Sequence, residues 1–131
     1  MTTLIAVCGV ATLAPEPSAA ATPVLATTIV LDREGGFAGT RDSFVVDGST
    51  AGGQRPRQLA SSPAFRRLRG SYPAGNPCCD RFSYRVTVTY RGGYRKTVTT
   101  VQGVAAPRIL WEVIAEVERV GTAPPPREAR S

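Results

Sequence analysis

The clearest pattern in the chain is a strict alternation of apolar and polar positions over residues 82–90. The apolar positions are Phe82, Tyr84, Val86, Val88 and Tyr90, and Ser, Arg or Thr residues stand between them. Successive side chains of a β-strand point to opposite faces of its sheet. The alternation therefore predicts a strand with one buried face and one face in water.

Three further segments are rich in β-branched residues and are predicted to be strands. Residues 27–33 and 40–47 flank a short glycine-rich segment, so we expect them to pair as an antiparallel hairpin. Residues 94–101 follow an Arg-Gly-Gly turn and are expected to pair with residues 82–90 as a second hairpin.

Two segments have helical patterns. Residues 55–69 carry only scattered apolar positions and an interior Pro63, which predicts a short or broken helix. A second helix is predicted from Pro107 to Gly121, because its apolar residues recur at the spacing of one helix face. Those residues are Leu110, Val113, Ile114 and Val117. Residues 71–80 are rich in turn-forming residues and are expected to be a surface loop.

The order of these elements predicts an α+β fold in two layers. In this ββαββα arrangement, a four-stranded antiparallel sheet is packed with two helices around one core. The predicted domain spans residues 27–121. A linker over residues 22–26 precedes it, and a disordered proline-rich tail over residues 122–131 follows it.

Residues 1–21 resemble a secretory signal peptide. An apolar run over residues 4–11 leads into the Ser-Ala-Ala-Ala of residues 18–21, although the usual positively charged start is missing. We therefore expect export and a secreted or extracytoplasmic location. The alternative is a disordered extension on a cytoplasmic protein.

The chain is basic, with a formal net charge of +6, and removal of residues 1–21 deletes only Glu16 and leaves +7. A basic surface favours nucleic acid, an anionic membrane or an acidic protein as a partner. The arginines are spread along the chain and form no recognised nucleic-acid motif, which favours an ordinary solvated surface.

Enzymatic chemistry has little support in the sequence. The chain contains no histidine, which is the commonest general base and metal ligand. Its three cysteines are Cys8 and the adjacent pair Cys78 and Cys79, whose spacing does not fit a zinc site. That pair could stay as thiols, form a strained bridge or link two chains. A redox role beside Arg81 is the least favoured function.

Four acidic residues flank the first hairpin, namely Asp32, Glu34, Asp42 and Asp47. They are interpreted as solvated carboxylates at strand ends in preference to a catalytic acidic pair. We expect no catalytic residues, no metal and no cofactor.

A glycine-rich turn lies between the first two predicted strands. It contains Gly35, Gly36 and Gly39 around Phe37, and therefore places an apolar ring on a flexible segment. Glycines allow positive φ and close approach of the backbone to a partner. An ordinary hairpin loop is the alternative interpretation.

Several blocks of the sequence, in this order and spacing, resemble the emfourin family. They are residues 31–39 with their Gly-Gly-Phe-Ala-Gly run, residues 45–47, residues 80–88, the Gly-Gly turn with residues 97–99, and the helix that begins at Pro107. The resemblance covers residues 27–121, nearly the whole predicted domain. Emfourins are bacterial protein inhibitors of thermolysin-like (M4) zinc metallopeptidases, the first of them described as the protealysin inhibitor.

The resemblance implies a monomeric inhibitor whose partner is such a peptidase, with no nucleic acid and no membrane bound after signal removal. Thermolysin-like enzymes as a class prefer a bulky apolar residue just after the bond they cleave, and they bind an extended segment in their cleft. We therefore expect the glycine-rich turn to enter that cleft with Phe37. The candidate binding residues are Glu34, Gly35, Gly36, Phe37, Ala38 and Gly39.

Two features depart from the family's pattern: Pro56 and Pro63 interrupt a helix that is usually regular, and the adjacent cysteines are not a known family feature. Two other functions stay open. A basic binding module would use Arg85 together with Arg95 and Lys96 on the water-facing side of the sheet. A purely structural or adhesive domain would affect no peptidase.

Overall fold

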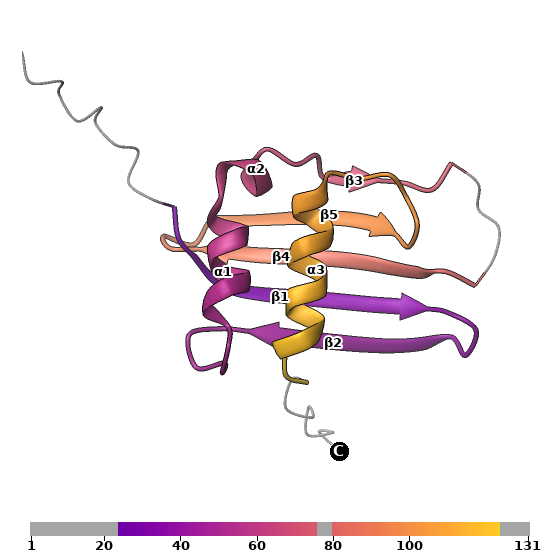
Figure 1. Cartoon of the computed structure of the whole chain (residues 1–131), viewed down its shortest axis with the longest axis horizontal. Helices are drawn as coiled ribbons and strands as arrows, with labels where there is room; N and C mark the ends of the chain where they lie inside the picture. Colours follow the sequence, from indigo (N-terminus) through magenta and orange to yellow (C-terminus); the bar gives the residue numbers. More distant parts are fainter. Residues whose placement is uncertain (1–23, 76–79, 124–131) are drawn as a thin grey trace, which may run out of the picture.

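The computed structural model describes residues 24–75 and 80–123 (Figure 1). The predicted signal peptide, all three cysteines and residues 124–131 of the predicted tail lie outside the described residues. Within the described ranges, no helix is long and apolar enough to cross a membrane.

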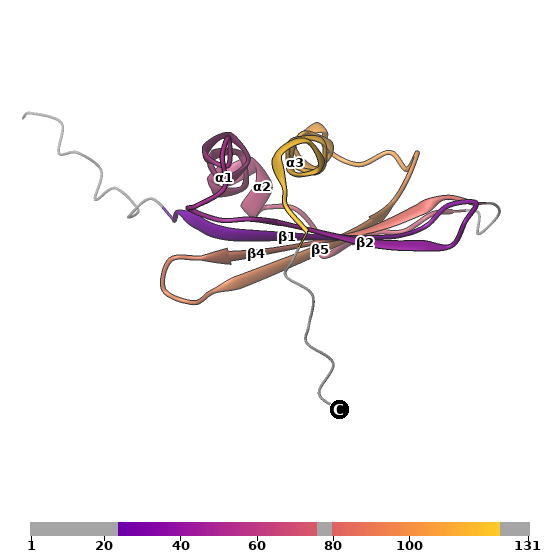
Figure 2. The same ribbon diagram turned by 90° about the horizontal axis from the view of Figure 1, so that it is seen from below.

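The described residues form one five-stranded sheet and three helices. The elements in chain order are β1 (Ala26–Gly35), β2 (Thr40–Val46), α1 (Gln54–Ser61), α2 (Pro63–Arg66), β3 (Ser71–Tyr72), β4 (Phe82–Tyr90), β5 (Arg95–Val101) and α3 (Arg108–Val120). The strand order in the sheet is β2-β1-β4-β5-β3. All three helices cover one face of the sheet, and the other face is open (Figure 2).

The predicted α+β class is confirmed, but a four-stranded, wholly antiparallel sheet with two helices is wrong. Residues 71–72 were expected to lie in a loop; they form β3, which pairs with β5 in parallel. The Gly70 carbonyl accepts a hydrogen bond from Thr99 N–H over 3.0 Å, and the Tyr72 carbonyl accepts one from Thr100 Oγ1 over 3.1 Å. The outer edge of β5 thus gains partners from a strand of two residues, which is too short to show alternation.

The expected broken helix is two helices, α1 and α2, separated at Ser62. Ser62 has an extended backbone, and its hydroxyl accepts a hydrogen bond from Phe65 N–H over 3.3 Å. Pro63 occupies the first turn of α2, where its missing N–H costs no hydrogen bond. This break turns Phe65 into the core, where it is fully buried.

The core lies between the helices and the covered face of the sheet. The alternation predicted for β4 is confirmed, since Tyr84, Val86, Val88 and Tyr90 are buried and Phe82 is partly buried. The predicted apolar stripe of α3 is buried as well: Leu110, Val113, Ile114 and Val117. Tyr90, the largest fully buried side chain, donates its hydroxyl to the Ala60 carbonyl over 2.8 Å and so joins β4 to α1.

The folded unit extends slightly beyond the predicted boundaries. Ala26 was assigned to the linker, but it is the first residue of β1 and is 3% exposed. Thr122 was assigned to the tail, but it exchanges two backbone hydrogen bonds with Val45, of 2.8 and 3.1 Å. These bonds cover part of the outer edge of β2.

Candidate functional site

The hairpin of β1 and β2 carries the segment that the sequence marked as a candidate site. We call residues 34–39 the tip. It lies at the opposite end of the sheet from the β4–β5 turn and beyond the helices (Figures 1 and 2). The Phe37 side chain is 95% exposed, and no other large apolar side chain in the described ranges is as exposed. The Phe37 ring is therefore accessible to a partner protein.

Glycine is required at two positions of the tip because the backbone passes close to the start of β4. Gly35 has φ +108°, and a Cβ there would lie 2.6 Å from the Arg81 carbonyl oxygen. Gly36 has φ +72°, and a Cβ there would lie 2.8 Å from the Phe82 ring. Side chains at either position would push the tip away from β4.

One backbone hydrogen bond closes the turn over residues 36–39, and a second ties the turn to the residue before β4. Gly39 N–H donates to the Gly36 carbonyl over 3.2 Å, and Gly36 N–H donates to the Arg81 carbonyl over 3.3 Å. Gly39 has φ +61°, and a Cβ there would meet no atom within 4 Å. Phe37 and Ala38 form the exposed outer part of this turn.

Arg33 anchors the base of the hairpin. Its guanidinium lies between the rings of Phe44 and Phe82, 5.1 and 4.9 Å from their centroids. It forms ion pairs with Asp42 on β2, at 3.0 Å, and with Glu118 on α3, at 2.6 Å. The hydrogen bond to Asp42 is the main cause that raises the pKa of Arg33 above its usual value. One side chain thus joins both hairpin strands to a helix.

The role of Arg33 was not predicted, although the amino-acid sequence contains a signal of it. Arg33 follows Ile29 and Leu31 at alternate positions of β1, and these two residues are fully buried. A charged residue that continues an apolar alternation lies on the covered face and needs partners there. Phe82 was likewise assigned only to the core, yet its ring lies beneath Gly36.

The four carboxylates that flank the hairpin do not form a pair; each has its own partner. Asp32 accepts from Ser43 Oγ over 2.6 Å, and Glu34 pairs with Arg41 at 3.0 Å. Asp42 binds Arg33, as described above, and Asp47 accepts hydrogen bonds from the backbone N–H and hydroxyl of Ser49. Nothing in this arrangement resembles two carboxylates that share a proton.

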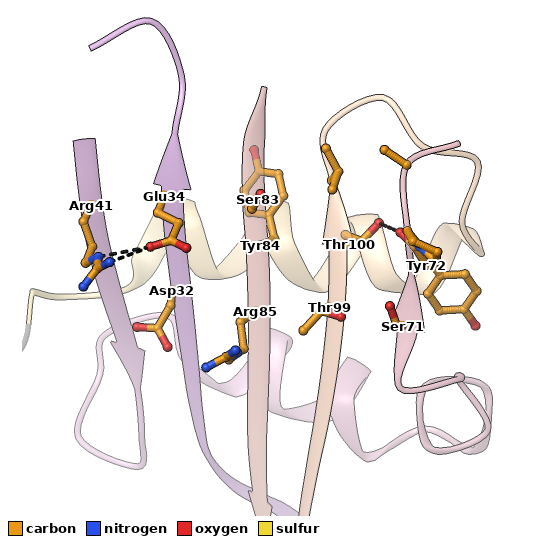
Figure 3. Close-up of a pocket in the computed structure, with 13 residues that line it drawn as sticks. Asp32, Glu34, Arg41, Ser71, Tyr72, Ser83, Tyr84, Arg85, Thr99 and Thr100 are labelled. Atoms are coloured by element: carbon orange, nitrogen blue, oxygen red, sulfur yellow. Dashed lines mark hydrogen bonds and ion pairs between the residues drawn. The ribbon is translucent and has the colours of Figure 1, made fainter. Parts of the chain in front are cut away.

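A shallow hollow of about 600 Å³ lies on the open face of the sheet and reaches the tip at Glu34. Its lining mixes polar and apolar surface and includes the side chains of Asp32, Arg41, Ser83 and Arg85 (Figure 3). The Glu34–Arg41 ion pair crosses the β1–β2 edge of this hollow (Figure 3).

The basic group expected on the water-facing side is only partly present. Arg85 pairs in register with Thr99, and Arg95 pairs with Thr89, so both side chains belong to the open face. Lys96 pairs with the buried Val88 and therefore lies on the covered face, where its Nζ donates to the Leu68 carbonyl over 2.7 Å. Adjacent residues of one strand point to opposite faces, so the expectation that Lys96 shares the open face with Arg95 and Arg85 was wrong.

No metal site was found: the described ranges contain no group of three His, Cys, Asp or Glu residues that could hold an ion.

The family model described as Emfourin matches residues 31–118 of the chain. This stretch contains the whole tip, Arg33, Phe82 and Glu118. No significant match was found among curated proteins or among solved structures.

Proposed function

The chain belongs to the emfourin family, a family of protease inhibitors, and from this we propose that it blocks thermolysin-like (M4) zinc metallopeptidases with its tip. The observation that carries the proposal is the Phe37 ring, which is 95% exposed on a turn that the rest of the fold holds in place. Such a ring matches the class preference of these peptidases for a bulky apolar residue just after the scissile bond.

Each residue of the tip has a different role in this proposal. Phe37 fills the specificity pocket of the peptidase. Ala38 and Gly39 carry little or no side chain, so the walls of the cleft can approach the backbone there. Gly35 and Gly36 fix the tip against β4, and Glu34 pairs with Arg41 at the border of the open sheet face.

The rigidity of the hairpin favours binding. A loop that must become ordered on association loses conformational entropy, which weakens affinity by about 0.5–1.5 kcal/mol for each immobilised side chain. Here the turn is already closed by backbone hydrogen bonds, and Arg33 ties the strands below it to α3. Most of this conformational entropy is therefore already lost when the protein folds, and little more is lost on binding.

We further propose that the mature protein is a monomer that starts after residue 21 and acts outside the cytoplasm. The apolar N-terminal run and its Ala-rich end support export. The inhibitory contact needs no cofactor, because it consists of an apolar side chain and a backbone turn.

The proposal is tested by titration of a thermolysin-like peptidase with the full chain while the cleavage of a small fluorogenic peptide is followed. Activity should fall in proportion to added protein and reach its minimum near one inhibitor per enzyme. A serine peptidase serves as the control and should keep its activity. Full activity of several thermolysin-like enzymes at excess folded protein would contradict the proposal and would favour the basic binding module.

A further inference from the structure

If Phe37 fills the pocket that follows the scissile bond, the peptide bond nearest the catalytic centre joins Gly36 to Phe37. This inference therefore rests on the proposed function. Hydrolysis would add the oxygen of water to the Gly36 carbonyl carbon and break the bond to the Phe37 nitrogen. The products would be a carboxylate on Gly36 and a free amine on Phe37. An inhibitor that is not consumed by the peptidase has to present the Phe37 ring while the Gly36–Phe37 bond stays uncleaved.

Both backbone polar groups of Gly36 are already engaged inside the molecule. Its carbonyl oxygen accepts a hydrogen bond from Gly39 N–H at 3.2 Å, and its N–H donates to the Arg81 carbonyl at 3.3 Å. A metallopeptidase polarises the carbonyl of the bond it cleaves, so that oxygen has to face the metal of the enzyme. In this turn the same oxygen faces the Gly39 N–H.

The backbone of the turn also differs from that of a substrate. An extended segment has negative φ at each residue, whereas Gly36 has φ +72° and Gly39 has φ +61°. Gly36 is held in this conformation by its hydrogen bond to the Arg81 carbonyl, and the Phe82 ring occupies the place that a side chain at Gly36 would need. To extend the segment, both hydrogen bonds of Gly36 would have to break.

We propose that the turn over residues 36–39 protects the Gly36–Phe37 bond from hydrolysis, so that the tip binds like a substrate but is not cut. Gly39 is the residue that controls this protection. It supplies the N–H that holds the Gly36 carbonyl, and it adopts the left-handed conformation that closes the turn. A Cβ at Gly39 meets no atom within 4 Å, so substitution there changes the turn without disturbing the packing.

The β4–β5 turn offers a matched control. Gly93 N–H donates to the Tyr90 carbonyl over 2.9 Å, Gly93 has φ +93°, and a Cβ there also meets no atom within 4 Å. The substitution Gly93→Pro therefore removes an equivalent bond at the opposite end of the sheet (Figure 1).

The experiment uses the full chain and the variants Gly39→Pro, Gly39→Val and Gly93→Pro. Proline removes the donor and forbids positive φ, while valine keeps the donor but strongly disfavours positive φ. Each protein is mixed with a thermolysin-like peptidase. Inhibition is measured at once, and mass spectrometry under denaturing conditions then locates any cut over the following hours.

We expect the wild type and Gly93→Pro to stay intact. Both Gly39 variants should be cut between Gly36 and Phe37 at least about tenfold faster, because proline removes the donor to the Gly36 carbonyl and valine disfavours the backbone conformation in which that hydrogen bond forms. The inference is overturned if both Gly39 variants stay as intact as the wild type, whether or not they inhibit. It is also overturned if the wild type is cut at this bond at the same rate. Failure of the proposed function is a separate result, because the wild type would then show no inhibition at mixing.

Discussion

Gly35 illustrates how one missing side chain determines the shape of the tip. A Cβ at this position would lie 2.6 Å from the Arg81 carbonyl oxygen, and the positive φ of +108° adds strain for any other residue. Glycine-rich composition alone could predict a turn here. It could not show that two of the glycines are needed for contact with β4, because that contact joins residues far apart in the sequence.

The substitution Gly35→Ala should lower the free energy of unfolding by about 2 kcal/mol or more, from backbone strain and steric conflict. Gly48→Ala is the control, since a Cβ at Gly48 meets no atom within 4 Å. It should change stability by less than about 0.5 kcal/mol. Urea denaturation measures both variants, and equal stability of the two would show that Gly35 is not constrained by β4.

At the scale of elements, Arg33 connects β1, β2 and α3. The residue was visible in the sequence only as an unexplained charge in an apolar alternation, and its partners Asp42 and Glu118 could not be assigned without the fold. Ion pairs of this kind depend on the relative placement of helix and sheet, which a local pattern does not contain.

Arg33→Ala should destabilise the protein by about 2–4 kcal/mol, because it leaves two carboxylates without their partner and removes a cation from between two rings. Arg41→Ala breaks the exposed pair with Glu34 and should cost less than about 1 kcal/mol. Thermal unfolding of the two variants distinguishes these effects. Similar costs would mean that Arg33 contributes no more than a surface ion pair.

The buried Tyr90 hydroxyl, which joins β4 to α1, should make the protein less stable at alkaline pH. Burial raises the pKa of Tyr90 from about 10 to about 12 in the folded protein. Above about pH 10 the unfolded chain loses this proton while the folded protein keeps it, so the free energy of unfolding falls as pH rises. The contribution is complete below about pH 10 and is lost between about pH 10 and 12.

Denaturation measured from neutral pH to about pH 11 tests this dependence. Tyr90→Phe should be less stable near neutral pH, because the Ala60 carbonyl loses its donor, but it should show a shallower decline above about pH 10. Tyr94→Phe is the control, since it keeps the stacked ring and removes only a hydroxyl from an exposed side chain. An unchanged decline in Tyr90→Phe would contradict the assignment.

The longer elements were predictable because each has a periodic pattern, as in β4 and the apolar stripe of α3. The pieces that sequence reasoning missed are short. Two residues of β3 and four of α2 are too few to show a period, and tertiary hydrogen bonds and the Ser62 cap stabilise them. Strand β3 and helix α2 therefore became visible only in the fold.

For the whole molecule, the fold separates the tip from the β4–β5 turn by the length of the sheet (Figure 1). Each of these ends carries an exposed aromatic residue, Phe37 at 95% and Tyr94 at 64%. If inhibition results from nonspecific hydrophobic contact of exposed rings, replacement of either residue should weaken it. If the tip enters the cleft of the peptidase, only Phe37 should matter.

The most direct test compares inhibition constants of the wild type, Phe37→Ala and Tyr94→Ala against one thermolysin-like peptidase, after unfolding curves show that all three fold. We predict that Phe37→Ala weakens inhibition by at least about 30-fold, as expected for a central contact residue, and that Tyr94→Ala stays within about twofold of the wild type. Undiminished inhibition by Phe37→Ala would contradict the claim that the tip is the inhibitory site.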